Sequence, residues 1–178
     1  MINRIMIARL SAWMAISVCS TSSYSSNSLD VEFSGELLST ACQVTTETVK
    51  QNITLYNLRW KTINEQGSSA ITPFNIKVHR CSTTDIGKSI KLTWQSPQLV
   101  TVGSEQYLST TGSSGVLLGL VDKEKKPIVW NKAVQIGSVT EVEGEQSFDF
   151  GVFVRKSESG EVKAGDFTGT VTFNVEYE

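Results

Sequence analysis

The sequence predicts an all-β protein with an immunoglobulin-like β-sandwich. Three observations support this prediction. Apolar and polar residues alternate within short segments, turn-like residues separate those segments, and no stretch of ten or more residues has convincing helical periodicity. The chain has 178 residues, of which 39% are hydrophobic and 19% charged, and this suits one folded domain. Short strands at regular intervals without intervening helices are typical of antiparallel sandwiches.

The first segment, residues 1–25, differs from the rest of the chain. Arg4 and Arg9 flank the start of an apolar run that ends near Cys19, and a Ser/Thr-rich stretch follows. This order predicts a secretory signal peptide cleaved near residue 25, because the run is too short and interrupted to span a membrane. Lipoprotein processing at Cys19 is the less favoured alternative, since Val18 occupies the position where a small residue is expected.

Candidate strands then follow one another along the chain. The segments 122–127 and 156–161 are charged or polar and are typical of hairpin connections. The predicted strands cover residues 29–38, 42–45, 52–58, 74–81, 89–95, 115–121, 128–131, 147–155 and 167–177.

Two cysteines, Cys42 and Cys81, remain after the signal peptide. In an exported chain an even pair favours one disulfide over two free thiols. Closing a loop of roughly 40 residues stabilises the fold by about 4 kcal/mol in the chain-entropy model. A metal site is disfavoured, because two cysteines and His79 are too few ligands at unsuitable spacing.

Amphipathic strands stand at both ends of the predicted mature chain. Near the C-terminus one parity is apolar and the other polar, and the apolar parity comprises Phe167, Gly169, Val171, Phe173, Val175 and Tyr177. Just after the signal peptide the apolar parity comprises Leu29, Val31, Phe33, Gly35 and Leu37. From periodicity alone, both are explained as ordinary members of one sandwich. A glycine on each apolar face is typical of a place where another chain passes closely.

The composition and motifs argue against an enzyme or a nucleic-acid binder. The net charge of −2 leaves no strong basic excess for a nucleic acid. His79 belongs to no recognisable motif, and we find no nucleophile elbow, phosphate loop or zinc signature, so we expect no catalytic residue, cofactor, metal or small-molecule substrate. Trp60, Trp94 and Trp130 are candidates for a sugar platform, although core packing is the commoner role.

These features together resemble the pilins of chaperone–usher fimbriae. That family ends in an amphipathic strand with a penultimate tyrosine, here Tyr177, and a glycine fourteenth from the end, here Gly165. It begins with an alternating extension that leads through a glycine to a disulfide cysteine, here Asp30-Val-Glu-Phe-Ser-Gly35 and then Cys42, with a second cysteine about forty residues later. The stretch 31–38 is most similar to minor, adaptor-type subunits.

The resemblance implies an incomplete immunoglobulin-like sandwich that a donor strand completes. Residues 26–37 would be the donor extension and residues 38–178 the pilin domain. Leu29, Val31, Phe33 and Leu37 would enter a neighbour's groove, with Gly35 where that groove has no room for a side chain. The C-terminal parity, with Gly165, would form this subunit's own groove and its chaperone edge. The expected partners are a periplasmic chaperone, an outer-membrane usher and neighbouring pilins, on the way through the periplasm to a surface fimbria.

Three alternatives to an adaptor pilin remain open at this point. A major shaft subunit and an assembly terminator belong to the same family and share these motifs. A freestanding secreted sandwich that binds carbohydrate lies outside it. A receptor-binding tip adhesin is disfavoured, because about 150 mature residues leave no room for an additional lectin domain.

Overall fold

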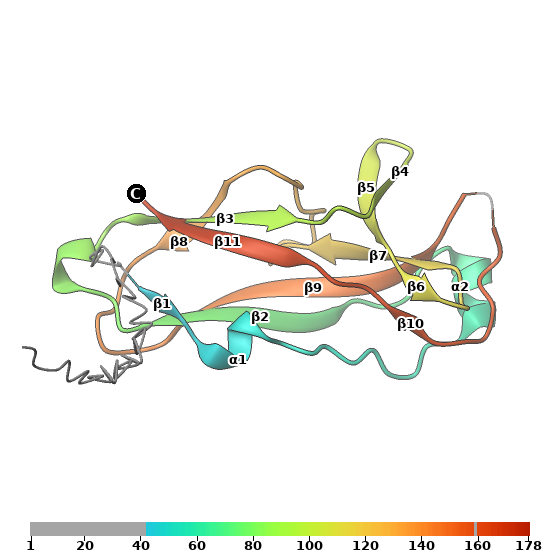
Figure 1. The fold of residues 1–178 in the computed structure, drawn as a ribbon, viewed down its shortest axis with the longest axis horizontal. Helices are drawn as coiled ribbons and strands as arrows, with labels where there is room; N and C mark the ends of the chain where they lie inside the picture. Colours follow the sequence, from blue (N-terminus) through green and yellow to red (C-terminus); the bar gives the residue numbers. More distant parts are fainter. Residues whose placement is uncertain (1–41, 159) are drawn as a thin grey trace, which may run out of the picture. The chain divides into compact units, whose positions relative to one another are not determined.

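The computed structural model describes residues 42–158 and 160–178, which form two main antiparallel sheets (Figure 1). The larger sheet has six strands in the order β1-β2-β9-β7-β5-β4. Its strands are β1 (Gln43–Val44), β2 (Thr72–His79), β9 (Gln146–Lys156), β7 (Val116–Val121), β5 (Glu105–Ser109) and β4 (Leu99–Val102). The long strands β2 and β9 are neighbours in this sheet and pair from Thr72↔Val152 to Val78↔Gln146.

The second sheet has three strands in the order β11-β3-β8. They are β11 (Thr172–Tyr177), β3 (Ser89–Gln95) and β8 (Val134–Ser138). A separate two-stranded ladder joins β10 (Phe167–Thr168) to β6 (Thr111–Gly112). The predicted C-terminal strand is therefore divided, because its first part pairs with β6 and its second part with β3.

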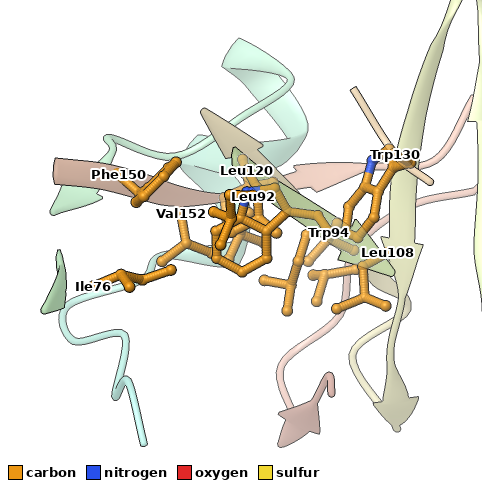
Figure 2. Packing of buried hydrophobic residues seen from close by; sticks show 13 residues of the cluster. Ile76, Leu92, Trp94, Leu108, Leu120, Trp130, Phe150 and Val152 are labelled. Atoms are coloured by element: carbon orange, nitrogen blue, oxygen red, sulfur yellow. The ribbon is translucent and has the colours of Figure 1, made fainter. Parts of the chain in front are cut away.

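Side chains from both sheets form the main core, as Figure 2 shows. Alternate residues of each strand point inward, so Ile76 of β2, Leu92 of β3 and Val154 of β9 are almost completely buried. Trp94 packs edge-on against Phe150, with ring centroids 5.2 Å apart. The two layers are thus joined by apolar contacts of the kind that hold a sandwich together.

The predicted disulfide is confirmed, and Cys42 and Cys81 are linked. It lies in a second, smaller core cluster with Val78, Ile90 and Val139. The bond connects the chain just before β1 to the end of β2, and β1 and β2 are already paired at Gln43↔His79. This end of the sandwich is therefore held by both a covalent bond and a strand ladder.

The helices of the described residues are short. They are α1 (Thr46–Val49), α2 (Trp60–Gln66) and the 3₁₀ turn η1 (Thr83–Asp85). Helix α2 buries only Ile63 and ends at Gly67, whose φ of 86° is the left-handed conformation that glycine adopts readily. One buried residue in seven gives too little periodicity for a sequence prediction of this helix.

Two predicted strands are wrong, and four observed strands were not predicted. Residues 52–58 form no strand, because no described strand lies beside them to supply backbone partners. Residues 128–131 form only an isolated bridge, Trp94↔Trp130, where the chain turns the indole into the core. The strands that were not predicted are β4, β5, β6 and β8, all at or near sheet edges.

Candidate functional site

A long apolar groove of about 1070 Å³ opens between two segments that are far apart in the sequence. Residues 48–58 form the first wall of the groove, and residues 165–171 together with Phe173 form the second wall. The core of the sandwich is exposed between them. The floor residues come from both sheets and are Phe74, Ile76, Trp94, Leu108, Leu118, Leu120 and Val152.

The first wall has no backbone pairing along most of its length. Thr48 is tied to β2, because its hydroxyl accepts a hydrogen bond from the Lys77 amide at 3.2 Å. Residues 50–58 make no backbone hydrogen bond to another described residue. Leu55 and Leu58 pack against the core, whereas Val49 and Tyr56 are 59% and 76% exposed. A segment with apolar side chains and unpaired amides resembles the open edge of a sheet, because its backbone groups are available to pair with another strand.

The second wall is open on the side away from its sheet. Strand β11 pairs with β3 along its whole length, from Thr172↔Gln95 to Tyr177↔Ile90, and it is the end strand of that sheet. Its odd-numbered side chains are partly buried and its even-numbered ones exposed, which is the alternation that the sequence predicted. The apolar face is thus only half covered within the described residues.

Two glycines allow the second wall to lie close to its neighbours. A Cβ atom on Gly165 would be 2.1 Å from the hydroxyl oxygen of Ser113. A Cβ atom on Gly169 would be 2.6 Å from a methyl carbon of Leu118 and 2.9 Å from one of Leu108, both in the groove floor. Gly169 also stands where the chain leaves β10 and continues to β11. A side chain at either position would therefore force the neighbouring side chains to move.

The structure brings most of the predicted edge residues into this groove. Gly165, Phe167, Gly169, Val171 and Phe173 line it. Val175 and Tyr177 continue along the same strand to the cluster around the disulfide. Burial raises the pKa of Tyr177 from 10.0 to about 12, and its hydroxyl has no hydrogen-bond partner among the described residues.

The residues predicted to form the donor strand lie outside the described part of the chain. They are Leu29, Val31, Phe33, Gly35 and Leu37. Sequence reasoning, for its part, missed the role of residues 48–58 as a groove wall. The β-branched and apolar residues Ile53, Thr54, Leu55 and Tyr56 gave a strand signal there, but no signal that the neighbouring strand would be missing.

The remaining candidates show no site geometry. No group of three or more His, Cys, Asp or Glu residues suited to a metal occurs among the described residues. Trp94 and Trp130 are buried, and the Trp130 indole donates a hydrogen bond to the Gln106 carbonyl at 2.9 Å, so they cannot form an open sugar platform with Trp60. No helix of the described residues is both long and apolar enough to cross a membrane.

Comparisons with known proteins give a consistent result. A family model described as fimbrial protein matches residues 31–178. The PRS fimbrial major pilin protein of Escherichia coli is 27% identical over 154 residues, which are 83% of this chain and 93% of that protein. The long polar fimbria protein A of Salmonella typhimurium is 28% identical over 177 residues, 94% of each chain.

Two solved structures share the fold. The P pilus rod subunit PapA matches with a TM-score of 0.62 at 21% identity, over 78% of this chain and all of that one. A chaperone–usher pilus structure matches with a TM-score of 0.65 at 21% identity, over 86% of this chain and 97% of that one. The chain covers nearly the full length of each of these proteins.

Proposed function

This chain belongs to the fimbrial protein family, whose members are exported and assembled into surface fimbriae, and we propose that a β-strand from another chain fills its groove. The observation that carries this proposal is the apolar groove whose two walls both present unpaired backbone. A single strand between residues 50–58 and β11 would pair on both sides and cover the exposed core. This is recognition by β-strand addition, in which the backbone supplies affinity and alternate side chains supply specificity.

The dimensions of the groove agree with one extended strand. The nine residues 50–58 would span about 30 Å at roughly 3.3 Å per residue. A donor of similar length places every second side chain over the floor residues. Burying four large apolar side chains contributes roughly 6–12 kcal/mol before the costs of ordering and association are subtracted. The groove is therefore large enough for a stable complex.

We propose residues 26–37 of a neighbouring subunit as the final donor. Leu29, Val31, Phe33 and Leu37 lie on one face of that segment, and Gly35 interrupts the row of side chains. Before assembly, a periplasmic chaperone would supply a strand to the same groove, next to Phe167 and the other apolar residues of the second wall. An outer-membrane usher would then be the place of exchange. The chain has no proposed enzymatic role.

Among the candidate positions of the subunit in its fimbria (adaptor, major rod and assembly terminator), the first two are each supported by an observation. The adaptor position is our prediction from residues 31–38. The major rod position is favoured by the relatives, because the PRS protein is a major pilin and PapA is a rod subunit. Counting subunits in purified fimbriae separates the two, since a rod subunit is present in many copies along each fibre and an adaptor in very few.

A deletion tests the donor role. Removal of residues 29–34 should leave a soluble complex with the chaperone, because the groove is intact, and should abolish incorporation of the variant as a donor. The matched control replaces Asp30 and Glu32, on the opposite face, by asparagine and glutamine, and should assemble normally. Normal polymerisation of the deletion variant would refute the proposal. So would a mature chain that is monomeric and stable without any partner or peptide.

A further inference from the structure

We propose that Asn64 is a positioning residue that ties the two walls of the groove together at one end and thereby controls how firmly a donor strand is held there. This inference rests on the proposed function. Helix α2 begins two residues after the first wall ends at Leu58, and Val162 lies three residues before the second wall begins at Gly165. Both walls therefore continue into the end of the sandwich where α2 lies, on the right of Figure 1.

The side chain of Asn64 makes two hydrogen bonds to the backbone of Val162. Its amide nitrogen donates to the Val162 carbonyl at 2.9 Å, and its amide oxygen accepts from the Val162 N–H at 2.8 Å. An asparagine side chain thus pairs with a backbone residue as a neighbouring strand would. Because both groups of one residue are engaged, the pairing fixes the orientation of the chain at Val162 as well as its distance.

Both partners of this pairing are held in place. The side chain of Val162 is 3% exposed and lies in the main core, as does that of Ile63, the neighbour of Asn64. The backbone carbonyl of Asn64 accepts a hydrogen bond from the Lys156 ammonium group at 3.0 Å. The Lys156 amide donates to the Gly67 carbonyl at 3.0 Å, just beyond the helix. The position of helix α2 is consequently fixed by the core packing of Ile63 and by the hydrogen bonds with Lys156.

No other hydrogen bond of the described residues joins the two chain segments that carry the walls. Among the described residues of 48–67 and 157–173, the hydrogen bonds that join the two segments are those between Asn64 and Val162. Residues 163–166 are exposed and gain only two further backbone bonds, from Lys163 to the Ser114 carbonyl and from Ser113 to the Asp166 carbonyl. These two bonds fix the second wall against β6 but not against the first wall. The separation of the walls at this end is therefore set by the hydrogen bonds of Asn64 together with the core packing of Ile63 and Val162.

The test measures donor binding with peptides of different length. The mature chain is refolded with a synthetic peptide of residues 27–39, or with that peptide shortened by four residues at one end or the other, and the dissociation rate of each complex is measured. Asn64→Ala removes both hydrogen bonds and Asn64→Asp removes the donated one. Glu65→Gln, on the exposed side of the same helix, is the control.

We expect Asn64→Ala to speed dissociation of the full peptide roughly tenfold, less than the full loss of two hydrogen bonds of ordinary strength because both bonds lie within the subunit. Asn64→Asp should have a smaller effect and Glu65→Gln none. One of the shortened peptides no longer reaches the tied end, and the effect should vanish with that peptide and persist with the other. Faster hydrogen exchange at the Val162 amide should accompany it in Asn64→Ala, whereas Asn64→Asp keeps an acceptor for that amide and should leave its exchange nearly unchanged.

Three other results would overturn the inference. Equal acceleration for all three peptides means that Asn64 only stabilises the fold as a whole. Unchanged dissociation of the full peptide from Asn64→Ala means that the walls are held without it. If the unmodified chain binds neither this peptide nor a fimbrial chaperone, the proposed function fails as well, whereas the first two results leave it standing.

Discussion

Phe173 stands directly opposite Trp94 across the β11–β3 ladder, and their rings meet edge to face with centroids 5.6 Å apart. Trp94 is 5% exposed, whereas Phe173 is only partly buried and faces the groove. The pair marks the point where the finished core of the sandwich becomes an unfinished one. The Trp94 ring is buried in the folded domain, whereas one face of the Phe173 ring is exposed to the groove.

Replacing Phe173 by aspartate should prevent stable filling of the groove. The carboxylate would have to lose its water beneath the donor strand, and the contact with Trp94 would be lost, at a combined cost of roughly 3 kcal/mol or more. We expect the variant to fail to accumulate in the periplasm and to bind the 27–39 peptide at least a hundredfold more weakly. Asn174→Asp, on the exposed face of the same strand, should behave like the unmodified chain. Equal peptide binding by both variants would remove Phe173 from the groove.

A methyl group at Gly169 should reshape the groove floor. Its Cβ atom would be 2.6 Å from Leu118 and 2.9 Å from Leu108, so both leucine side chains would have to move. Such overpacking costs about 1–3 kcal/mol. Gly169→Ala should therefore weaken peptide binding about tenfold or more in an equilibrium titration, while Glu176→Ala, on the exposed face of β11 and outside the groove, should not. Tighter binding by Gly169→Ala would show that the floor has spare room.

Loss of the disulfide should lower the free energy of unfolding of the peptide-bound protein. The bond spans 39 residues, and the chain-entropy model gives about 4 kcal/mol for a loop of this size. The double variant Cys42→Ser/Cys81→Ser should accordingly unfold at a lower urea concentration, with a similar dependence of the unfolding free energy on urea. The unmodified protein with reductant should approach the same midpoint. A midpoint that does not move would mean that the β1–β2 ladder and its core suffice.

Alkaline pH should destabilise the fold through Tyr177. Burial raises its pKa from 10.0 to about 12, so the folded chain keeps the phenol proton in a range where the unfolded chain releases it. The stability that this provides is complete below about pH 10 and is lost as the pH rises towards 12. Tyr177→Phe should be neutral or slightly stabilising at pH 7, because the hydroxyl has no described partner.

The measurement compares unfolding of the unmodified and Tyr177→Phe proteins from pH 8 to pH 12. The difference between the two should grow in favour of phenylalanine above about pH 10. Tyr107, whose pKa burial also raises, is present in both proteins and so does not contribute to the difference. Parallel curves for the two proteins would mean that the Tyr177 phenol is hydrated in solution.

The sequence was most informative where a side-chain pattern determines structure by itself. The alternation from Phe167 to Tyr177, the cysteine pair and the strand at β3 could be predicted because each depends on which residues face the core. The division of the last strand at Gly169 could not, because it depends on which sheet each half joins. The two-residue turn Gly103-Ser104 between β4 and β5 is a hairpin signal in the sequence, although these two strands were not predicted.

The error at residues 52–58 has a different cause. The pattern there is that of a strand, but a strand is defined by its hydrogen-bonded neighbour, and no described residue supplies one. The sequence shows the side-chain composition of a strand at residues 52–58, but it does not show whether a neighbouring strand is available to pair with it. In the same way, no periodicity pointed to Asn64, since its importance lies in a contact 98 residues away with Val162.

The unpaired amides of residues 50–58 have a consequence for the durability of a fibre. Such a segment is the natural point of attack for a protease in an isolated subunit, because an extended chain without partners fits an active site directly. Once a neighbour's strand covers it, the same segment is enclosed. Resistance to digestion would then depend on assembly, because the strand of one subunit would cover residues 50–58 of its neighbour.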